Sequence, residues 1–342
     1  MTTTKKQHYV PRCYLKNFLS ANDRINVFDS FKLQIREQKI MDIAMENYFY
    51  DIKFSDLLQR IEKEGEEKDK KKIMEILDVH EWESVPDKLD EKYIEKDFFS
   101  PLEDIYSKLL QKFIENSYEG NNWVMENCLA CSEFEKDLMA FFIAIQFIRT
   151  KSFRENLGDM IAKLYQTIAY KRQMKNEDAL PKEAFEFKAN PDFVKLQHSS
   201  MILDKEATLE TAEILRNHIW VIYVNKSESP FYTSDNPIAI IPHKRDKYRV
   251  HAGLASEGVE IVFPISSKLL LAMYEKTTYN EIFSDKQFHV LTSESDINYF
   301  NSYQVLQRYR CIFSEKKNFE FANKIYEENP ELQKYQSRIE VG

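Results

Sequence analysis

Three segments of the sequence place polar side chains among apolar and aromatic residues, where burying an unpartnered polar group costs about 1–3 kcal/mol. The first segment runs over residues 7–15 and contains His8 and Arg12. Histidine exchanges protons near neutral pH, and the guanidinium of arginine binds phosphate or carboxylate. We therefore consider His8 for acid–base catalysis and Arg12 for anion binding. The structural alternative pairs Arg12 with a core carboxylate and His8 with a backbone carbonyl.

The second segment contains Gln146 and Arg149 in a helix-forming run that is apolar on nearly all sides. The two residues are three positions apart, so they share one helix face. An arginine on a core helix needs an anionic partner, which is either a bound ligand or an acid of the chain. Glu103 and Asp235 are the internal candidates. The pattern thus indicates either a site or a structural ion pair.

The third segment, residues 232–237, lies between two apolar strand-like runs and contains Ser234, Asp235 and Asn236 before a proline. These side chains could contact a substrate, but the same residue types also favour a tight turn. The candidate catalytic residues from the three segments and their internal partners are His8, Arg12, Glu103, Gln146, Arg149 and Asp235. The candidate substrate-binding residues are Tyr9, Tyr14, Asn47, Tyr50, Thr150, Ser234, Asn236 and Asn301.

Several common functional motifs are absent from the sequence. It has no glycine-rich dinucleotide or phosphate loop, no G-x-S-x-G and no H-E-x-x-H. Cys128 and Cys131 form one C-x-x-C pair, but a structural zinc site needs a second pair or two histidines. We therefore expect ordinary buried thiols. No signal peptide or membrane-length apolar run is present, which predicts a soluble cytoplasmic protein.

The charge balance limits the choice of partner. The chain of 342 residues has 48 Lys and Arg against 56 Asp and Glu, which gives a formal net charge of −8. This acidic balance argues against broad, nonspecific binding of nucleic acid, although a local basic cleft is compatible with it.

Helix-capping signals show where the elements that carry these residues begin. Ser100 and Pro101 predict a helix start with Ser100 as the N-cap, and this start puts Glu103 in the first turn. Ser132 and Glu135 have the spacing of a capping box. The helix that follows Ser132 is apolar almost all round, which predicts a central position in the core.

Hydrophobic periodicity predicts the remaining elements. Helices are expected over residues 100–113, 132–148, 153–170, 205–217, 293–306 and 319–326, with a loop or short helix over 176–200. Strands are expected over residues 24–29, 219–224, 238–241, 259–263, 269–273 and 309–313, with 31–40 as the hairpin partner of the first. Helices and strands are segregated along the chain, which predicts an α+β fold with a helical core on a mainly antiparallel sheet.

We expect one domain over residues 1–342, made of four parts. These are an N-terminal module with a β-hairpin, a charged insertion with a solvated face, a helical core, and a sheet with C-terminal helices, over residues 7–54, 55–96, 97–217 and 218–328.

The polar segments also resemble a known family. Residues 7–18 read Q-H-Y-V-P-R-x-Y-L-x-x-F, and 46–50, 146–150, 233–237 and 263–266 read E-N-Y-F-Y, Q-x-x-R-T, T-S-D-N-P and F-P-I-S. In this order they resemble the domain of unknown function 4238 family, with Glu103 and Asn301 at its acid and late asparagine. The family more often has an aromatic residue at Cys13, and residues 55–96 match nothing we can name in it. The resemblance implies a shared polar site and supplies no reaction.

Our leading hypothesis is a hydrolase that acts on a phosphate-containing substrate, most plausibly a nuclease or nucleotide-directed effector, which the resemblance associates with defence and toxins. The arginines would neutralise phosphate, His8 would be acid or base, and Gln146 and Asn236 would position the substrate. Glu103 and Asp235 could hold a divalent metal, Mg²⁺ or Mn²⁺, or orient a water. The alternatives are a non-catalytic anion- or nucleotide-binding module with a protein partner, and a purely structural ion-pair network.

Overall fold

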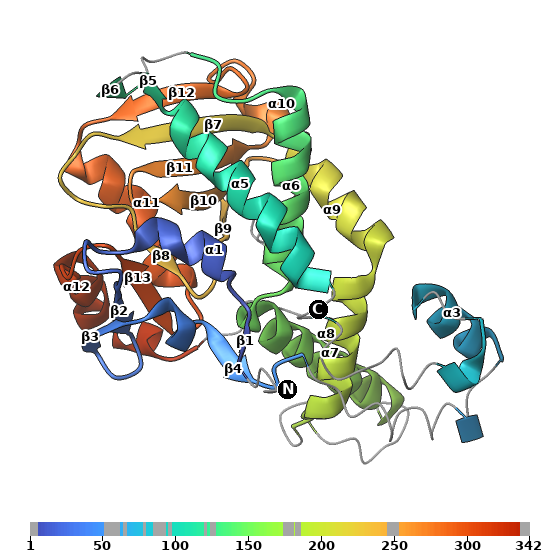
Figure 1. The fold of residues 1–342 in the computed structure, drawn as a ribbon. Helices are drawn as coiled ribbons and strands as arrows, with labels where there is room; N and C mark the ends of the chain where they lie inside the picture. Colours follow the sequence, from blue (N-terminus) through green and yellow to red (C-terminus); the bar gives the residue numbers. More distant parts are fainter. Residues whose placement is uncertain are drawn as a thin grey trace.

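The computed structural model describes residues 6–50, 62–63, 67–77, 80–84, 94, 98–119, 122–123, 128–173, 181, 186–244 and 253–335. Within this part of the chain, helices and mainly antiparallel strands form separate layers, which confirms the α+β prediction (Figure 1). Most of the predicted charged insertion, residues 55–96, lies outside the described residues. Its longest described element is helix α3 (Glu67–Leu77).

A five-stranded sheet forms the centre of the molecule. Its order is β12 (Gln287–Leu291), β7 (Ile219–Asn225), β11 (Leu269–Tyr274), β10 (Val259–Ser266) and β9 (Ala239–Pro242). Only the β12–β7 pair is parallel. Every residue of β7, β10 and β11 is buried, as expected for strands with both faces covered.

Alternate residues of β7 show what covers each face. Trp220 and Ile222 belong to the main core, which packs against helices α5 (Ser100–Asn116) and α6 (Glu133–Ile148). Val221 on the other face belongs to a second core with α11 (Glu294–Gln307). The sheet therefore lies between two helical layers (Figure 1).

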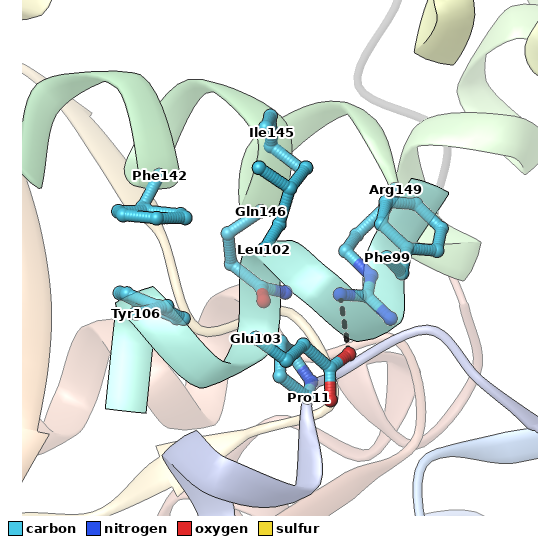
Figure 2. Close-up of a pocket in the computed structure, with 9 residues that line it drawn as sticks. All are labelled: Pro11, Phe99, Leu102, Glu103, Tyr106, Phe142, Ile145, Gln146 and Arg149. Carbon is cyan, nitrogen blue, oxygen red and sulfur yellow. Dashed lines mark hydrogen bonds and ion pairs between the residues drawn. The ribbon is translucent and has the colours of Figure 1, made fainter. Parts of the chain in front are cut away.

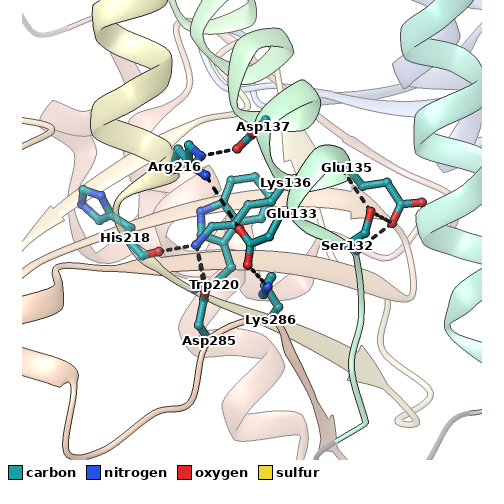
Figure 3. A network of polar contacts seen from close by, with 10 residues as sticks. All are labelled: Ser132, Glu133, Glu135, Lys136, Asp137, Arg216, His218, Trp220, Asp285 and Lys286. Carbon is teal, nitrogen blue, oxygen red and sulfur yellow. Dashed lines mark hydrogen bonds and ion pairs between the residues drawn. The ribbon is translucent and has the colours of Figure 1, made fainter.

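The start of α6 is held at the edge of this sheet by charged contacts (Figure 3). The predicted capping box is present, since Ser132 and Glu135 bond each other's backbone amide. One turn on, buried Lys136 donates to both carboxylate oxygens of Asp285 at 2.9 Å and to the His218 carbonyl at 2.9 Å. These bonds tie α6 to the strands β7 and β12, whose first residues lie beside Asp285 and His218.

A second sheet brings the two ends of the chain together. Its order is β3 (Gln34–Gln38), β2 (Ile25–Asp29), β13 (Cys311–Ser314) and β8 (Thr233–Ser234), all antiparallel. The predicted N-terminal hairpin is thus confirmed. Helix α12 (Glu320–Glu328) covers this sheet and supplies part of a third core.

The N-terminal residues lie beside the long helices. Strand β1 (Lys6–His8) pairs with β4 (Met45–Asn47) and leads into the short helix α1 (Arg12–Leu15). Helix α7 (Lys151–Gln173) follows α6 after a sharp turn and lies close to β1 and β4 (Figure 1). Helix α9 (Lys205–Arg216) packs along α6.

Three local predictions differ from the structure. Ser100 is the first residue of α5 and not its N-cap, because the preceding Phe98–Phe99 segment already has helical backbone and no side chain caps the helix. The stretch 176–200 contains most of a 13-residue helix, α8 (Pro191–Leu203), which Asn190 caps. Strand β12 was not predicted, because its residues are mostly half-buried and lack a clean apolar run.

Smaller elements of the described part include helix α10 (Lys276–Tyr279) and the strands β5 (Tyr118–Glu119) and β6 (Asn122–Trp123), which pair with each other. None of the helices described has both the length and the apolar character needed to cross a membrane.

Candidate functional site

Arg149 ends α6 and is almost fully buried, at 2% exposure. Its Nη1 donates to Glu103 Oε1 at 3.0 Å, and its Nη2 donates to the His8 carbonyl at 2.6 Å. The guanidinium lies over the ring of Phe99, 3.9 Å from its centre. Of the two internal acids considered, Glu103 is therefore the partner, and Arg149 joins α5, α6 and β1.

The space beside this ion pair is small (Figure 2). We call it the arginine pocket; its lining residues are Pro11, Phe99, Leu102, Glu103, Tyr106, Phe142, Ile145, Gln146 and Arg149. Its volume of about 10 Å³ is that of a single water molecule. A phosphate group does not fit without a rearrangement of the packed walls.

Gln146 and Tyr106 bring polar atoms to the arginine pocket. The Gln146 amide nitrogen donates to the Tyr9 carbonyl at a long 3.4 Å. Among the described residues, neither the Gln146 Oε1 atom nor the Tyr106 hydroxyl has a hydrogen-bond partner. The pocket is thus sized and lined for one hydrogen-bonding molecule of water size.

His8 and Arg12 do not line the arginine pocket. The His8 ring is buried, with Nε2 at 3.3 Å from the Ile40 carbonyl. Burial, and then the charge of Arg12, lower the pKa of His8 to about 4, so the ring is neutral at neutral pH. Arg12 is exposed, and its Nη1 lies 2.8 Å from the Met41 sulfur. No ion pair of Arg12 occurs within the described ranges, so the predicted carboxylate partner is not found there.

Two of the candidate tyrosines make internal contacts. The hydroxyl of buried Tyr14 bonds the Thr233 hydroxyl at 2.6 Å and donates to the Pro264 carbonyl at 2.7 Å. The Tyr50 hydroxyl donates to the Arg149 carbonyl at 3.1 Å. Both side chains therefore join elements that are distant in the sequence.

Two further candidates are Thr150, which follows Arg149 in the chain, and Asn47 in β4. The Thr150 hydroxyl donates to the Phe147 carbonyl and accepts from the Phe153 amide, both at 3.2 Å, and so shapes the turn between α6 and α7. Asn47 is exposed in β4, opposite Lys6.

Residues 230–237, which include β8, are held against helix α11 by hydrogen bonds. Ser234 donates to the Gln304 side chain at 2.9 Å, and Asn236 donates to the Gln307 carbonyl at 2.8 Å. The amide group of Asn301 bonds two backbone groups of residues 230–232. These residues hold the segment in the shape that positions Asp235.

Asp235 is 1% exposed and accepts hydrogen bonds from three successive backbone amides. These donors are Tyr309 at 2.8 Å, Arg310 at 2.9 Å and Cys311 at 2.8 Å. Burial raises the pKa of Asp235 to about 6, against the opposing effect of the three amides. Because the Arg310 amide also lies 3.2 Å from Oδ1, each carboxylate oxygen accepts from two amides, which fills the roughly four lone-pair positions of the carboxylate.

Asp235 lines an open cleft, which we call the polar cleft, of about 210 Å³. The lining residues are Tyr9, Val27, Arg36, Asp42, Ile43, Ala44, Met45, Glu46, Lys151, Asp235, Tyr309, Arg310, Cys311 and Phe313. They come from β2, β3, β4, β13, the start of α7 and the segments that follow β1 and β8 or lie between these elements. Unlike the arginine pocket, this cleft has room for a small ligand.

The cations of the polar cleft are held by acids. Arg310 donates Nε and Nη2 to the two oxygens of buried Asp29 at 3.0 and 2.7 Å, and Arg36 Nη1 bonds the same carboxylate at 3.2 Å. Burial raises the pKa of Asp29, but the bond and charge of Arg310 and the charge of Arg36 outweigh it and lower the pKa overall. Two cations share one carboxylate, so this group of three carries one net positive charge, while the acids Asp42, Glu46 and Asp235 also line the cleft. Lys151 pairs with Glu46 at 2.6 Å.

The candidate residues therefore divide between two places. Glu103, Gln146 and Arg149 line the arginine pocket, whereas Asp235 lines the polar cleft. The side chains of His8 and Arg12 line neither. Strand β1 and the residue after it join the two, because the His8 and Tyr9 carbonyls accept hydrogen bonds from Arg149 and Gln146, and Tyr9 also lines the cleft.

The sequence analysis did not identify the cleft residues Arg36, Lys151 and Arg310 as candidates. Lys151 directly follows the Q-x-x-R-T motif, and its partner Glu46 belongs to the E-N-Y-F-Y motif, so their position at these motifs was an available signal. Arg36 and Arg310 had no such signal, because they meet only when β2 pairs with both β3 and β13.

No metal site is preformed in the described part of the chain, where no three acids, histidines or cysteines could together hold an ion. Glu103 and Asp235, the two candidate ligands, line different pockets. Both thiols of the C-x-x-C pair are free; Cys131 is buried as predicted, whereas Cys128 is exposed, so the prediction of a buried thiol is wrong there. Burial raises the pKa of Cys131 to about 12, as expected for an unreactive thiol.

Comparison with known proteins gives one match. No curated protein and no solved structure matches the chain. The sequence profile of one family matches residues 6–318, and this is the family that the motifs resemble. The chain thus belongs to the family described as Protein of unknown function (DUF4238).

Proposed function

We propose that this protein hydrolyses a phosphate-containing substrate in the polar cleft, with Asp235 as the general base. One observation carries the proposal. A carboxyl group with a pKa raised to about 6 lies in the wall of a cleft that also presents Arg36, Lys151 and Arg310. A base with a pKa near the working pH is efficient in proton transfer, and cations stabilise the charge that develops on phosphate.

Arg36 and Arg310, which we call the arginine pair, would bind the phosphate. Asp29 engages Nε and Nη2 of Arg310, so its Nη1 is left for a substrate oxygen. The excess positive charge of Arg36 and Arg310 over Asp29 favours an anion at this wall. Because Asp29 is fully buried, it fixes both guanidinium groups before the substrate arrives.

Lys151 and Tyr309 would complete the contacts. The Lys151–Glu46 ion pair is partly exposed, with 23% and 47% of the side chains accessible, so a phosphate can replace Glu46 at small cost. Burial raises the pKa of Tyr309 to about 12, which keeps its hydroxyl protonated as a hydrogen-bond donor.

In the proposed step, Asp235 removes a proton from a water molecule in the polar cleft, which replaces the longest amide contact of the carboxylate, that of Arg310 with Oδ1 at 3.2 Å. The water oxygen attacks phosphorus, the phosphorus–oxygen bond to the leaving group breaks, and the leaving oxygen takes a proton from solvent. A phosphodiester of nucleic acid or of a nucleotide is the substrate class that we favour. We place this activity in the cytoplasm, where such substrates are available.

A specific observation also favours the second candidate, an anion- or nucleotide-binding module without turnover. Asp235 is almost inaccessible, and three main-chain amides already occupy its oxygens, an arrangement that equally suits a carboxylate holding β8 against β13. Under this alternative the arginines bind the anion and no bond is cleaved.

The test is cleavage of labelled RNA, single- and double-stranded DNA and a small phosphodiester, each with and without Mg²⁺ or Mn²⁺. Wild type is compared with Asp235→Asn and Lys151→Met, and Glu257→Gln is the control because its ion pair with Lys244 is exposed. Hydrolysis predicts at least hundredfold slower cleavage in folded Asp235→Asn and unchanged cleavage in Glu257→Gln. Binding without cleavage by wild type supports the second candidate.

A further inference from the structure

Arg154, in the first turns of α7, is a fixed guanidinium paired with a neutral group. Its Nε and Nη2 atoms lie 3.0 and 2.9 Å from His198 Nδ1, and its centre lies 3.5 Å from the middle of the Phe49 ring. His198 in turn donates from Nε2 to the Ile148 carbonyl at 2.7 Å. Burial and the charge of Arg154 hold the pKa of His198 at about 3, so the ring stays neutral.

No carboxylate neutralises this cation. In the part of the chain that the structure describes, Arg154 forms no ion pair within 4.0 Å. Glu46 and Glu155 act on it only from a longer range. Burial lowers the pKa of Arg154 to about 10, which leaves it charged at neutral pH. A guanidinium that is stacked, oriented and uncompensated is prepared for an anionic partner.

Arg154 does not itself line the polar cleft but shares a helix face with a residue that does. Lys151, which lines the cleft, is three residues earlier, so the two side chains occupy the same face of α7. Glu46 connects them, because it pairs with Lys151 and its charge also acts on Arg154. The Nη1 atom of Arg154 makes no hydrogen bond to any described residue, and the side chain is only partly buried. An anion extending from Lys151 along α7 therefore meets this guanidinium.

We propose that Arg154 is a specificity-determining residue that binds a second phosphate of the ligand in the polar cleft. The inference rests on the proposed function and narrows its substrate class to molecules with at least two phosphate groups. Oligonucleotides and nucleoside diphosphates both meet this requirement. A ligand with one phosphate reaches the arginine pair and Lys151 but not Arg154.

The experiment measures binding of inorganic phosphate and of pyrophosphate to the full chain by isothermal titration calorimetry. Wild type is compared with Arg154→Gln, Arg154→Lys and Arg172→Gln, the last an exposed arginine near the far end of the same helix. We expect pyrophosphate to bind wild type more tightly than phosphate. Arg154→Gln should lose tenfold or more for pyrophosphate and less than twofold for phosphate, because one charge-assisted contact is removed.

Arg154→Lys keeps the positive charge but lacks the planar guanidinium, so we expect an intermediate loss of pyrophosphate affinity. Arg172→Gln should bind both anions like wild type. Equal pyrophosphate affinity of wild type and Arg154→Gln would overturn the inference and leave the proposed function standing. Absence of any phosphate or pyrophosphate binding by wild type would overturn both. A selective loss in Arg154→Gln without substrate cleavage would support the inference and contradict the hydrolysis. Repeating the titration with a dinucleotide and a nucleoside diphosphate separates the two sources of paired phosphates.

Discussion

Arg149 and Arg154, five residues apart, show how burial and charge balance distinguish a structural arginine from one that can bind a ligand. Arg149 and Arg154 each place a guanidinium over a phenylalanine ring, Phe99 in one case and Phe49 in the other. Arg149 is neutralised by Glu103 and borders a pocket of about 10 Å³. Among the described residues, Arg154 forms hydrogen bonds only with the neutral His198, and it shares a helix face with Lys151, which lines a cleft of about 210 Å³.

The difference teaches that a polar residue in an apolar run is not by itself a site. The arginine of the Q-x-x-R-T motif uses its contacts to join α5, α6 and β1, so the structural reading of this residue fits its surroundings. The neighbouring arginine, which belongs to no motif that we recognised, retains an unbalanced charge. Space and charge balance, which only the fold defines, distinguish the two.

The largest effect should come from removing the acid of the compensated pair. Glu103→Leu leaves the buried Arg149 guanidinium without its carboxylate, and we expect a loss of about 3–5 kcal/mol in the free energy of unfolding. Urea titration followed by circular dichroism measures it. Glu257→Gln, which breaks an exposed pair with Lys244, should cost less than about 1 kcal/mol. Equal losses in the two variants would contradict the architectural role of Arg149.

The contributions of His8 and Asp235 to the free energy of unfolding should change with pH in opposite directions. The pKa of His8 is lowered to about 4 from 6.5, so the stability that it contributes is lost as the pH falls through this window. The pKa of Asp235 is raised to about 6 from 3.8, so its burial costs stability as the pH rises through that window. His8→Gln should therefore reduce the loss of stability between pH 7 and pH 4.5, by on the order of 2 kcal/mol. A difference between wild type and His8→Gln that is the same at both pH values would refute this.

Arg154→Gln should destabilise the protein far less than Glu103→Leu. The variant loses the contact with Phe49 but leaves no buried charge unpaired, and glutamine can still donate to His198. We expect a loss of about 1 kcal/mol in urea titration. A loss as large as that of Glu103→Leu would show that the two arginines have the same structural role.

The smallest effect is expected at Gln146. Its Oε1 atom has no hydrogen-bond partner among the described residues, and its amide makes only one long bond. Gln146→Leu should therefore change the free energy of unfolding by less than about 1 kcal/mol in either direction. A clear loss of stability would mean that the amide is held by an ordered water in the arginine pocket.

Local sequence signals predicted much of the fold. The Ser132–Glu135 capping box marks the start of α6, and the apolar run over residues 219–224 marks strand β7. Such signals depend only on residues that are close in the sequence, so they can be read from a single sequence. The predicted Ser100 cap is absent because Phe98 and Phe99 before it already have helical backbone.

The site was predictable only in part, because it depends on long-range pairing. Glu103 and Asp235 were equally good partners for Arg149 until the packing of α5 on α6 selected Glu103. The contact of Arg310 with Asp29 spans 281 positions of the chain and exists only through the pairing of β13 with β2. No periodicity along the sequence indicates such a contact.

The most direct test of the central claim is the pH dependence of phosphodiester cleavage by wild type and by folded Asp235→Asn. With Asp235 as the base, kcat/KM for wild type should rise tenfold per pH unit below about 6 and level off above it, and the variant should lack this limb. Thermal melting confirms that the variant is folded at each pH. Equal cleavage by both proteins across this range, or cleavage by neither, would contradict the assignment of the polar cleft as a hydrolytic site.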